Sequence, residues 1–440
     1  MIQILKNRTY RHLFFAQIVA LTGTGLATVA LGLLAFDLAG GEAALVLGTA
    51  LTIKMVAYVL VAPVAAALAE RIDRRRVLVF LDLIRAAVAL CLPFVTEIWQ
   101  IYVLIFLLQS ASAGFTPSFQ ATIPEVLPNE DDYTKALSLS RLAMDLESLL
   151  SPLLAAALLT LTGFATLFWG TAFGFIASAC LVVSVALPSP RPTKPRPIWE
   201  RTTRGIRLYL KTPRLRGLLA LCWASSTTGA MVFVNTVNLV KSDLALGDRS
   251  VALTLGAFGL GSMLAAFTLP RLIKQSEDRS VMVTGAAISL ISLGGFAVAL
   301  MTTPLDLPLL LITWAGIGVG FSATLTPSGR VLSRSAHSAD RPAIFAAHFT
   351  LSHGCWLVAY PLSGWLMITV GAGPTALILA ALASVGAGAA LALWPRHSSD
   401  VREHSHDDLP PDHPHLTGPG PHAHAIIIDD LHPHFPTTRG

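Results

Sequence analysis

The sequence predicts an all-α membrane protein with twelve transmembrane helices in two six-helix bundles, followed by a disordered C-terminal tail. Apolar residues make up 53% of the chain and charged residues 13%, whereas soluble domains have roughly 45–50% and about 25%. Apolar runs long enough to cross a hydrocarbon core of about 30 Å recur along the whole chain before the tail. The excess of basic residues follows membrane topology, as shown below, and gives no support for a nucleic-acid partner.

The predicted spans form two sets of six. The first set covers about 13–38, 44–69, 77–95, 98–119, 133–161 and 163–187, and the second covers about 215–240, 250–270, 280–301, 306–328, 341–368 and 371–394. The first run follows a short polar start, is too long for a signal-peptide core and lacks a clear cleavage site. It is therefore predicted to be a retained first span.

A Pro-rich segment from Pro188 to Pro197 and a basic amphipathic stretch from Ile198 to Arg216 separate the two sets. We therefore predict four regions. They are an N-terminal bundle (1–187), a cytosolic basic linker (188–216), a C-terminal bundle (217–394) and a disordered His-rich cytosolic tail (395–440).

A faint internal repeat supports this division. Gly114-Phe115-Thr116-Pro117-Ser118 in the fourth span resembles Gly320-Phe321 and Thr326-Pro327-Ser328 in the tenth, and Pro152 corresponds to Pro361 with nearly the same shift. A duplicated six-plus-six transporter places its substrate path between the halves.

The distribution of basic residues predicts the orientation. Of the 31 Lys and Arg, all but Lys54, Arg85, Lys241 and Arg249 fall on the side that holds both termini. Basic residues concentrate on the cytoplasmic side of membrane proteins. We predict a multi-pass protein of the inner (plasma) membrane with both termini in the cytoplasm.

The loop after the second span resembles the signature of the major facilitator superfamily. It runs from Ala66 to Leu78 and includes Glu70-Arg71-Ile72-Asp73-Arg74-Arg75. Ala66 and Asp73 stand where the pattern has Gly, and Glu70 stands where it has Asp. The resemblance implies a conformational latch made by Glu70, Arg71, Asp73, Arg74 and Arg75.

Further stretches resemble the exporter branch that includes siderophore and macrolide exporters. They are Tyr10–Gln17 with Gly23-Thr24-Gly25, and Ser112–Pro117 running to Ile123–Pro128. The branch implies efflux by proton antiport, although its antiporter motif is reduced here to Ser151-Pro152. The chain lacks a Gly-x4-Gly-Lys-Ser/Thr loop, which argues against a nucleotide-driven pump. We predict a transporter and not an enzyme, with no cofactor.

The tail carries a metal-binding pattern. Nine of the 13 histidines follow Arg396, and eight of them form His-x-His pairs: His404/His406, His413/His415, His422/His424 and His432/His434. Residues i and i+2 point the same way in an extended chain, so each pair offers two imidazoles to one ion. Imidazole suits Ni(II), Zn(II) and Cu(II). Together with the exporter branch, the tail resembles that of nickel-resistance permeases of the NreB type, which implies export of Ni(II) and Co(II).

Ionisable groups at membrane depth are the candidate transport-site residues. They are Glu147 and Asp145 in the fifth span, His348, His353 and Cys355 in the eleventh, and Lys54 in the second. Asp145 lies four residues after Arg141, the spacing of an ordinary helix salt bridge. His348 and His353 are about 140° apart around a helix, so they grip one ion only if the helix unwinds at Gly354.

Lys54 leaves alternatives open, because a buried cation fits an anionic substrate more easily than a divalent metal. We predict proton-coupled export of a divalent metal ion, most readily Ni(II), that confers metal resistance. The expected partners are the lipid bilayer, the metal ion and protons, without an obligate protein partner. The alternatives are an exporter of a drug or siderophore with a regulatory metal-binding tail, and a metal sensor that does not transport.

Overall fold

The computed structural model describes residues 2–69, 73–129, 132–133, 136, 139–140, 143, 147, 151, 153–187, 198–273, 277–336, 340–394, 401–404, 422–425 and 428. In the first half the helices are α1 (Arg8–Ala39), α2 (Ala43–Ala69), α3 (Arg74–Cys91), α4 (Ile98–Val126) and α6 (Ala165–Val183). In the second half they are α8 (Pro213–Asn238), α9 (Asp248–Ile273), α10 (Asp278–Thr302), α11 (Leu307–Leu325), α12 (Ser328–Arg334), α13 (Arg341–Val370) and α14 (Ala372–Leu393).

Shorter elements connect these helices. They are the linker helix α7 (Ile198–Lys211), the 3-10 turns η1 (Ile2–Lys6), η2 (Gly40–Glu42) and η3 (Leu92–Phe94), and the π-turn η4 (Leu239–Asp243). Side chains mark two of the helix starts. Asn7 accepts a hydrogen bond from the Tyr10 amide at 3.0 Å, and Asp306 accepts one from the Leu309 amide at 2.8 Å. Such caps satisfy amides that the first helical turn leaves without a partner.

The helices confirm the predicted all-α membrane fold. Nine helical segments of the described chain are long and apolar enough to cross a membrane, and the first of them contains α1 and most of α2. Most of the fifth predicted span lies outside the described residues, and α13 is not among the nine segments. The count of twelve therefore stays a prediction.

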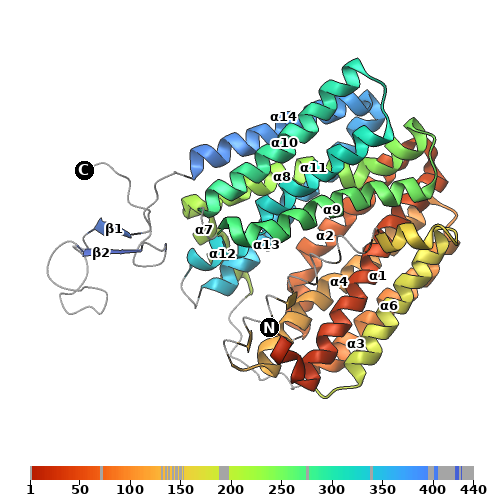
Figure 1. Ribbon diagram of the computed structural model, residues 1–440. Coiled ribbons are helices and arrows are strands. Elements are labelled where there is room, and N and C mark those ends of the chain that lie inside the picture. The colour runs from red at the N-terminus through yellow and green to blue at the C-terminus, as the bar shows by residue number, and fades with distance from the viewer. Residues whose placement is uncertain are drawn as a thin grey trace.

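The helices form two groups (Figure 1). In the first group α1 packs on α6 and α2, and α3 packs on α6 and α4; in the second, α11 packs on α9 and α10, and α8 packs on α14 and α13. The groups meet where α2 contacts α13 and where α1 and α2 contact α8. Because this boundary joins opposite halves of the sequence, contacts between its side chains depend on the relative position of the two groups.

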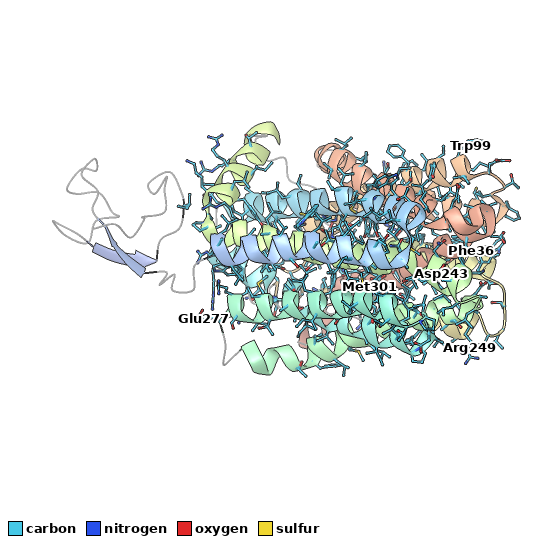
Figure 2. The ribbon with its side chains drawn as sticks, turned by 90° about the horizontal axis from the view of Figure 1, so that it is seen from above. Phe36, Trp99, Asp243, Arg249, Glu277 and Met301 are labelled. Atoms are coloured by element: carbon cyan, nitrogen blue, oxygen red, sulfur yellow. The ribbon has the colours of Figure 1, made fainter. Side chains whose placement is uncertain are left out.

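The long helices give the molecule two ends. Figure 2 shows Phe36, Trp99 and Arg249 together at one end and Glu277 at the other, the end beside the two short strands. We name the second the basic end, since it holds α7 and the arginines that begin α3 and end α12. The first is named the far end.

Glycines bring the two groups into close contact at the far end. A Cβ atom on Gly48 of α2 would lie 2.9 Å from the carbonyl oxygen of Tyr360 in α13, and one on Gly32 of α1 would lie 2.8 Å from a methyl group of Val237 in α8. Lys241 also lies over the Phe36 ring, 4.8 Å from its centre. These contacts leave no room for larger side chains, so the groups are tightly joined there.

Burial along α13 changes toward the basic end. Ala359, Tyr360 and Ser363 are buried, whereas every residue from 348 to 354 is partly exposed. The boundary between the groups is therefore packed at the far end and looser at the basic end.

The described part of the tail contains two short strands. Strands β1 (Val401–His404) and β2 (His422–Ala425) pair antiparallel, with His404 opposite His422 and His424 opposite Arg402 in the register. This pairing gives the backbone of His404, His422 and His424 an extended conformation, and disorder of the tail as a whole stays a prediction.

The register also bears on the predicted metal pairs. His422 and His424 are two residues apart in β2, which is the spacing of the predicted pairs. The residue opposite His424 is the cation Arg402 and not a further ligand, whereas His422 has His404 opposite. Metal binding by these three histidines stays a prediction. His406, His413, His415, His432 and His434 lie outside the described residues.

One later residue of the tail lies against the second group. Ile428 is 3% exposed and belongs to the apolar cluster that contains Leu332 and Trp394. The chain therefore contacts the second group again at this residue.

Candidate transport site

The candidate site lies where α2 of the first group faces α13 of the second. The ring of Tyr58 stacks on the imidazole of His353 at 5.5 Å with an interplanar angle of 10°. Phe349, one turn earlier in α13, lies 5.9 Å from the same tyrosine ring. An aromatic contact thus joins the two groups on the basic-end side of their packed boundary.

Two opposite charges stand beside this contact. Lys54 precedes Tyr58 by four residues and so shares its face of α2. The charge of Lys54 acts on both Glu147 and His353. Glu147 itself reaches α1, since a Cβ on Gly25 would lie 2.7 Å from its Oε1. Residues from both groups therefore converge on one region.

Lys54 and Glu147 remain without direct partners. Within the described chain, neither side chain makes a hydrogen bond or a salt bridge, and both are partly exposed although protein surrounds them. Burying an unpaired charge is costly, and such residues in a membrane protein are functional candidates. A lysine and a carboxylate held near each other without bonding can exchange that interaction for a cargo or a proton.

His353 presents one free nitrogen. Its Nδ1 lies 2.7 Å from the carbonyl oxygen of Phe349, and a carbonyl only accepts, so Nδ1–H is the donor. When the imidazole is neutral, Nε2 keeps its lone pair for a ligand. Metal-binding histidines are commonly oriented by such a bond from the other ring nitrogen.

The other predicted ligands of α13 point elsewhere. His348 Nδ1 lies 3.0 Å from the hydroxyl of Tyr209 in α7. Burial raises the pKa of Tyr209, so its phenol stays protonated. Cys355 donates its thiol to the Leu351 carbonyl at 3.5 Å and lines a separate pocket. Since α13 continues as a helix through Gly354, it does not unwind to bring His348 and His353 together.

The structure therefore brings together Lys54, Glu147 and His353, and separates His348 and Cys355 from them. Among the residues that it describes, no group of three or more His, Cys, Asp or Glu is close enough to hold a metal ion. Asp145 lies outside the described residues. Tyr58 was missed in the sequence, although its spacing of four from Lys54 in an apolar helix was a signal.

The predicted latch residues can be placed in part. Glu70 and Arg71 lie outside the described residues. Asp73 caps α3 by accepting from the Arg76 amide at 3.0 Å. Arg74 forms an ion pair with Glu125 near the end of α4 at 3.1 Å, and Arg75 donates to the Val183 carbonyl at the end of α6. The arginines thus tie the start of α3 to two neighbouring helix ends.

The second group contains a matching set that the sequence analysis did not identify. Asp278, at the start of α10, pairs with Arg330 and with Arg334 of α12, the latter at 3.4 Å. Arg279 donates to the Trp394 carbonyl at 2.6 Å, just after α14. Glu277 occupies the N-cap position of α10, as Asp73 does in α3. The shift between Arg74 and Asp278 is 204 residues, whereas the matched prolines are 209 and 210 apart, so the repeat seen in the sequence does not align these residues.

The two packed bundles with unpaired charges at their boundary are typical of a membrane transporter, and comparison with known proteins shows the family. Residues 13–240 match the model of the Major Facilitator Superfamily, so the chain belongs to this family. An uncharacterized MFS-type transporter, YvqJ of Bacillus subtilis (strain 168), is 24% identical over 79% of this chain and 83% of its own. Macrolide efflux protein A of Streptococcus pyogenes is 25% identical over 33% of this chain and 37% of its own.

A solved structure shares the fold. The crystal structure of the nucleoside transporter NupG superposes with a TM-score of 0.65 at 14% identity, over 88% of this chain and 98% of that one. At this identity the likeness shows the fold and not the substrate. The chain is thus a multi-pass membrane transporter of the major facilitator fold.

Proposed function

We propose that this transporter exports a divalent transition metal, most readily Ni(II) and also Co(II), from the cytoplasm by proton antiport. The observation that carries the proposal is the series of four His-x-His pairs in the tail, because paired imidazoles select borderline metal ions. The histidine-rich tail resembles that of nickel-resistance permeases of the NreB type. The basic end faces the cytoplasm, in accordance with the positive-inside rule.

The proposed cargo site is the boundary region of Glu147, His353 and Lys54. A divalent cation is attracted by the Glu147 carboxylate and binds the free Nε2 of His353, while Lys54 is repelled and withdraws. Because α2 and α13 belong to different bundles, occupation of the site changes the contact between them. Opening of the glycine contacts at the far end then releases the ion to the other side.

Glu147 is the proposed coupling group. Its carboxylate alternates between a metal ion and a proton, so that each proton that enters neutralises the group and lowers its affinity for the metal. After the carboxylate has released its proton to the cytoplasm, Lys54 pairs with it until the next metal ion binds. Antiport of this kind needs a carboxylate without a permanent partner, and Glu147 has none within the described residues.

A second function is supported by different residues. Lys54 is a cation, and Tyr58 and Phe349 offer aromatic faces, so the same region would suit an organic anion. The similarity to macrolide efflux protein A agrees with an organic cargo. In that case the tail binds metal as a regulator.

Nickel accumulation in a metal-sensitive bacterial host separates these proposals. Cells would express the full chain, the chain ending at Arg396, or Glu147→Gln, with cobalt, zinc and a macrolide tested in parallel. We expect the full chain to lower cellular nickel at least severalfold and Glu147→Gln to abolish the effect. Glu42→Gln, an exposed carboxylate of η2 at the far end, is the matched control and should behave as wild type.

The outcomes are distinct. Protection against the macrolide without any change in nickel would favour the organic cargo. If purified protein binds nickel but reconstituted vesicles transport neither metal nor drug, the chain is a sensor. Full activity of Glu147→Gln would remove this residue from the coupling step.

A further inference from the structure

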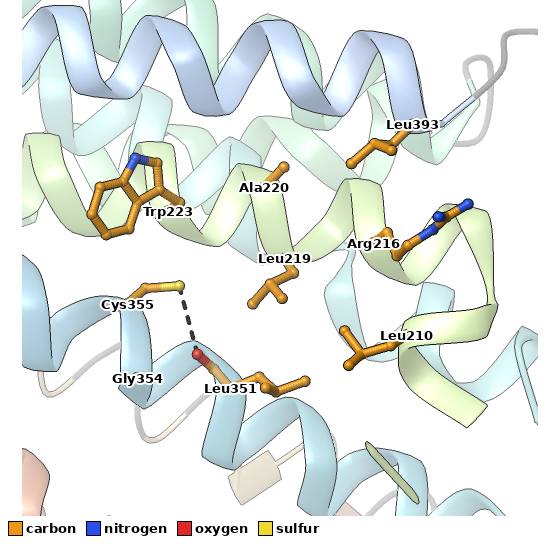
Figure 3. A pocket seen from close by; sticks show the side chains of 9 residues that line it. All are labelled: Leu210, Arg216, Leu219, Ala220, Trp223, Leu351, Gly354, Cys355 and Leu393. Atoms are coloured by element: carbon orange, nitrogen blue, oxygen red, sulfur yellow. Dashed lines mark hydrogen bonds between the residues drawn. The ribbon is translucent and has the colours of Figure 1, made fainter. Parts of the chain in front are cut away.

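An open cavity lies on the opposite side of α13 from the candidate transport site. It has a volume of about 490 Å³ and is formed by α7, α8, α13 and α14 (Figure 3). Cys355, on its wall, follows His353 by two residues, which is about 200° around a helix. Helix α13 therefore separates this cavity from the contact between Tyr58 and His353.

The cavity is apolar except at one end. Leu219, Trp223, Leu351 and Leu393 are among its walls, and Arg216 is its one charged lining residue. In Figure 3 Arg216 lies beside α7 at the basic end, and Trp223 lies at the other end of the cavity. Seven helical residues separate them, a span of about 10 Å. The polarity thus falls from the mouth of the cavity toward the membrane interior.

Two further cations lie close to the lining residue Leu210 in the sequence of α7. Arg207 and Lys211 of α7 flank Leu210, which lines the cavity, and both are exposed like Arg216. None of these three side chains makes a hydrogen bond or an ion pair with any residue that the structure describes. Basic pockets beside transmembrane helices attract anionic lipid headgroups.

We infer that this cavity binds one anionic phospholipid from the leaflet at the basic end. The headgroup phosphate contacts Arg216, with Arg207 and Lys211 nearby, and an acyl chain lies along α8 toward Trp223. A chain of methylene groups matches the leucine walls, and the charge at the mouth selects an anionic over a zwitterionic headgroup. Because the acyl chain contacts α13 behind His353, the lipid supports the helix that carries the candidate site.

The glycine at 354 permits a clean test of this site. A Cβ atom there would meet nothing within 4 Å, although Gly354 lines the cavity. Gly354→Leu therefore fills the cavity without displacing the backbone. Gly388→Leu is the matched control, because Gly388 lies on the exposed side of α14 and its Cβ would also meet nothing within 4 Å.

The experiment is native mass spectrometry of the full chain released from nanodiscs that contain equal phosphatidylglycerol and phosphatidylcholine. We expect wild type and Gly388→Leu to retain one phosphatidylglycerol, and Gly354→Leu to lose it. Arg216→Gln should weaken retention about fivefold, as expected for one basic contact, whereas Arg249→Gln at the far end should not. Equal retention of both lipids, or retention by Gly354→Leu equal to wild type, would overturn the assignment.

A second measurement uses the wild-type protein, so its result does not depend on whether a variant folds. Phosphatidylglycerol with a photoreactive group on its acyl chain should cross-link to the segments around Leu219 and Leu351, and unlabelled phosphatidylglycerol should compete. Cross-links confined to other helices contradict the site. The cross-link does not depend on the transported cargo, so failure here is distinguishable from failure of the proposed function.

Discussion

At the basic end, each of the two bundles has an ion pair that connects the start of one helix to a neighbouring helix, but the charges are reversed between the bundles. In the first, the helix that follows the signature loop begins with Arg74 and pairs with Glu125; in the second, the corresponding helix begins with Asp278 and pairs with Arg330 and Arg334. The next residue, Arg75 or Arg279, donates in both cases to a carbonyl at the end of the last helix of its bundle. Position and bonding role are shared, and only the sign of the pair is exchanged.

The difference matters because helix ends carry partial charges. A helix N-terminus is partly positive and a C-terminus partly negative. Asp278 at an N-terminus and Arg334 in a last turn agree with these dipoles, whereas Arg74 at an N-terminus and Glu125 near a C-terminus oppose them. Each helix end contributes about 0.3–1 kcal/mol. The comparison indicates that the ion pairs of Asp278 are stable in the second bundle, and that the ion pair between Arg74 and Glu125 in the first bundle opens more easily.

Removal of the carboxylate from the second bundle should have the largest effect. Asp278→Asn leaves Arg330 and Arg334 without their shared anion, and the side chain of Asp278 is only 8% exposed. We expect a loss of about 2 kcal/mol in the free energy of unfolding, below the range for fully buried pairs because the arginines are partly solvated. Thermal unfolding in detergent, followed by tryptophan fluorescence, measures it. Glu125→Gln should cost less, and an equal or larger cost there would contradict the comparison.

The arginines that donate to carbonyls should rank next. Arg279 is 8% exposed and bonds the Trp394 and Leu391 carbonyls, whereas the Arg75 bond is exposed. Hydrogen bonds to charged groups contribute about 1.5–3 kcal/mol when shielded from water. Arg279→Gln should therefore lower the unfolding temperature more than Arg75→Gln. The reverse order would contradict the argument that the more buried contact contributes more to stability.

An exchange of charges tests the dipole argument directly. Arg74→Glu combined with Glu125→Arg gives the first bundle the polarity of the second, and each charge then suits its helix end. We expect a gain of about 1 kcal/mol in stability and a slower transport rate, because the tie opens less readily. Each single substitution places like charges together and serves as the destabilised control. A double variant that is both less stable than wild type and faster would reject the idea.

The linker helix adds a contact to the second bundle, and its loss should have the smallest effect. Arg204 of α7 holds Asp340 with two hydrogen bonds of 2.9 and 3.3 Å, and 40% of its side chain is exposed. Arg204→Lys keeps the charge but loses the forked geometry. We expect a cost below about 1 kcal/mol, measured by protease cleavage of the linker at increasing temperature. Arg207→Lys, a substitution in the same helix without a bonded partner in the described chain, is the control.

The sequence was sufficient for the all-α membrane fold because its apolar signal is periodic and long. The apolar spans predict the helices without knowledge of contacts, whereas the orientation and the duplication inferred from basic loops and matched prolines stay predictions. The site is different, since Glu147 and His353 come from opposite halves and meet only through packing. The register of α13 then sends His348 toward Tyr209 and His353 toward Tyr58, a choice set by neighbouring helices. For the same reason, sequence analysis did not predict the ion pairs of Asp278 or the hydrogen bonds of Arg279.

The burial of Ile428 limits how far the histidines can travel. Trp394 and Ile428 belong to one apolar cluster, so the chain between them, with six of the eight paired histidines, starts and ends at the second bundle. Ligands on such a tether reach local concentrations on the order of millimolar. Metal bound by the tail would then stay concentrated beside the basic end of the transporter instead of diffusing into the cytoplasm. Ile428→Asp should raise the nickel concentration needed for half-maximal export; if export is unchanged, this role is lost.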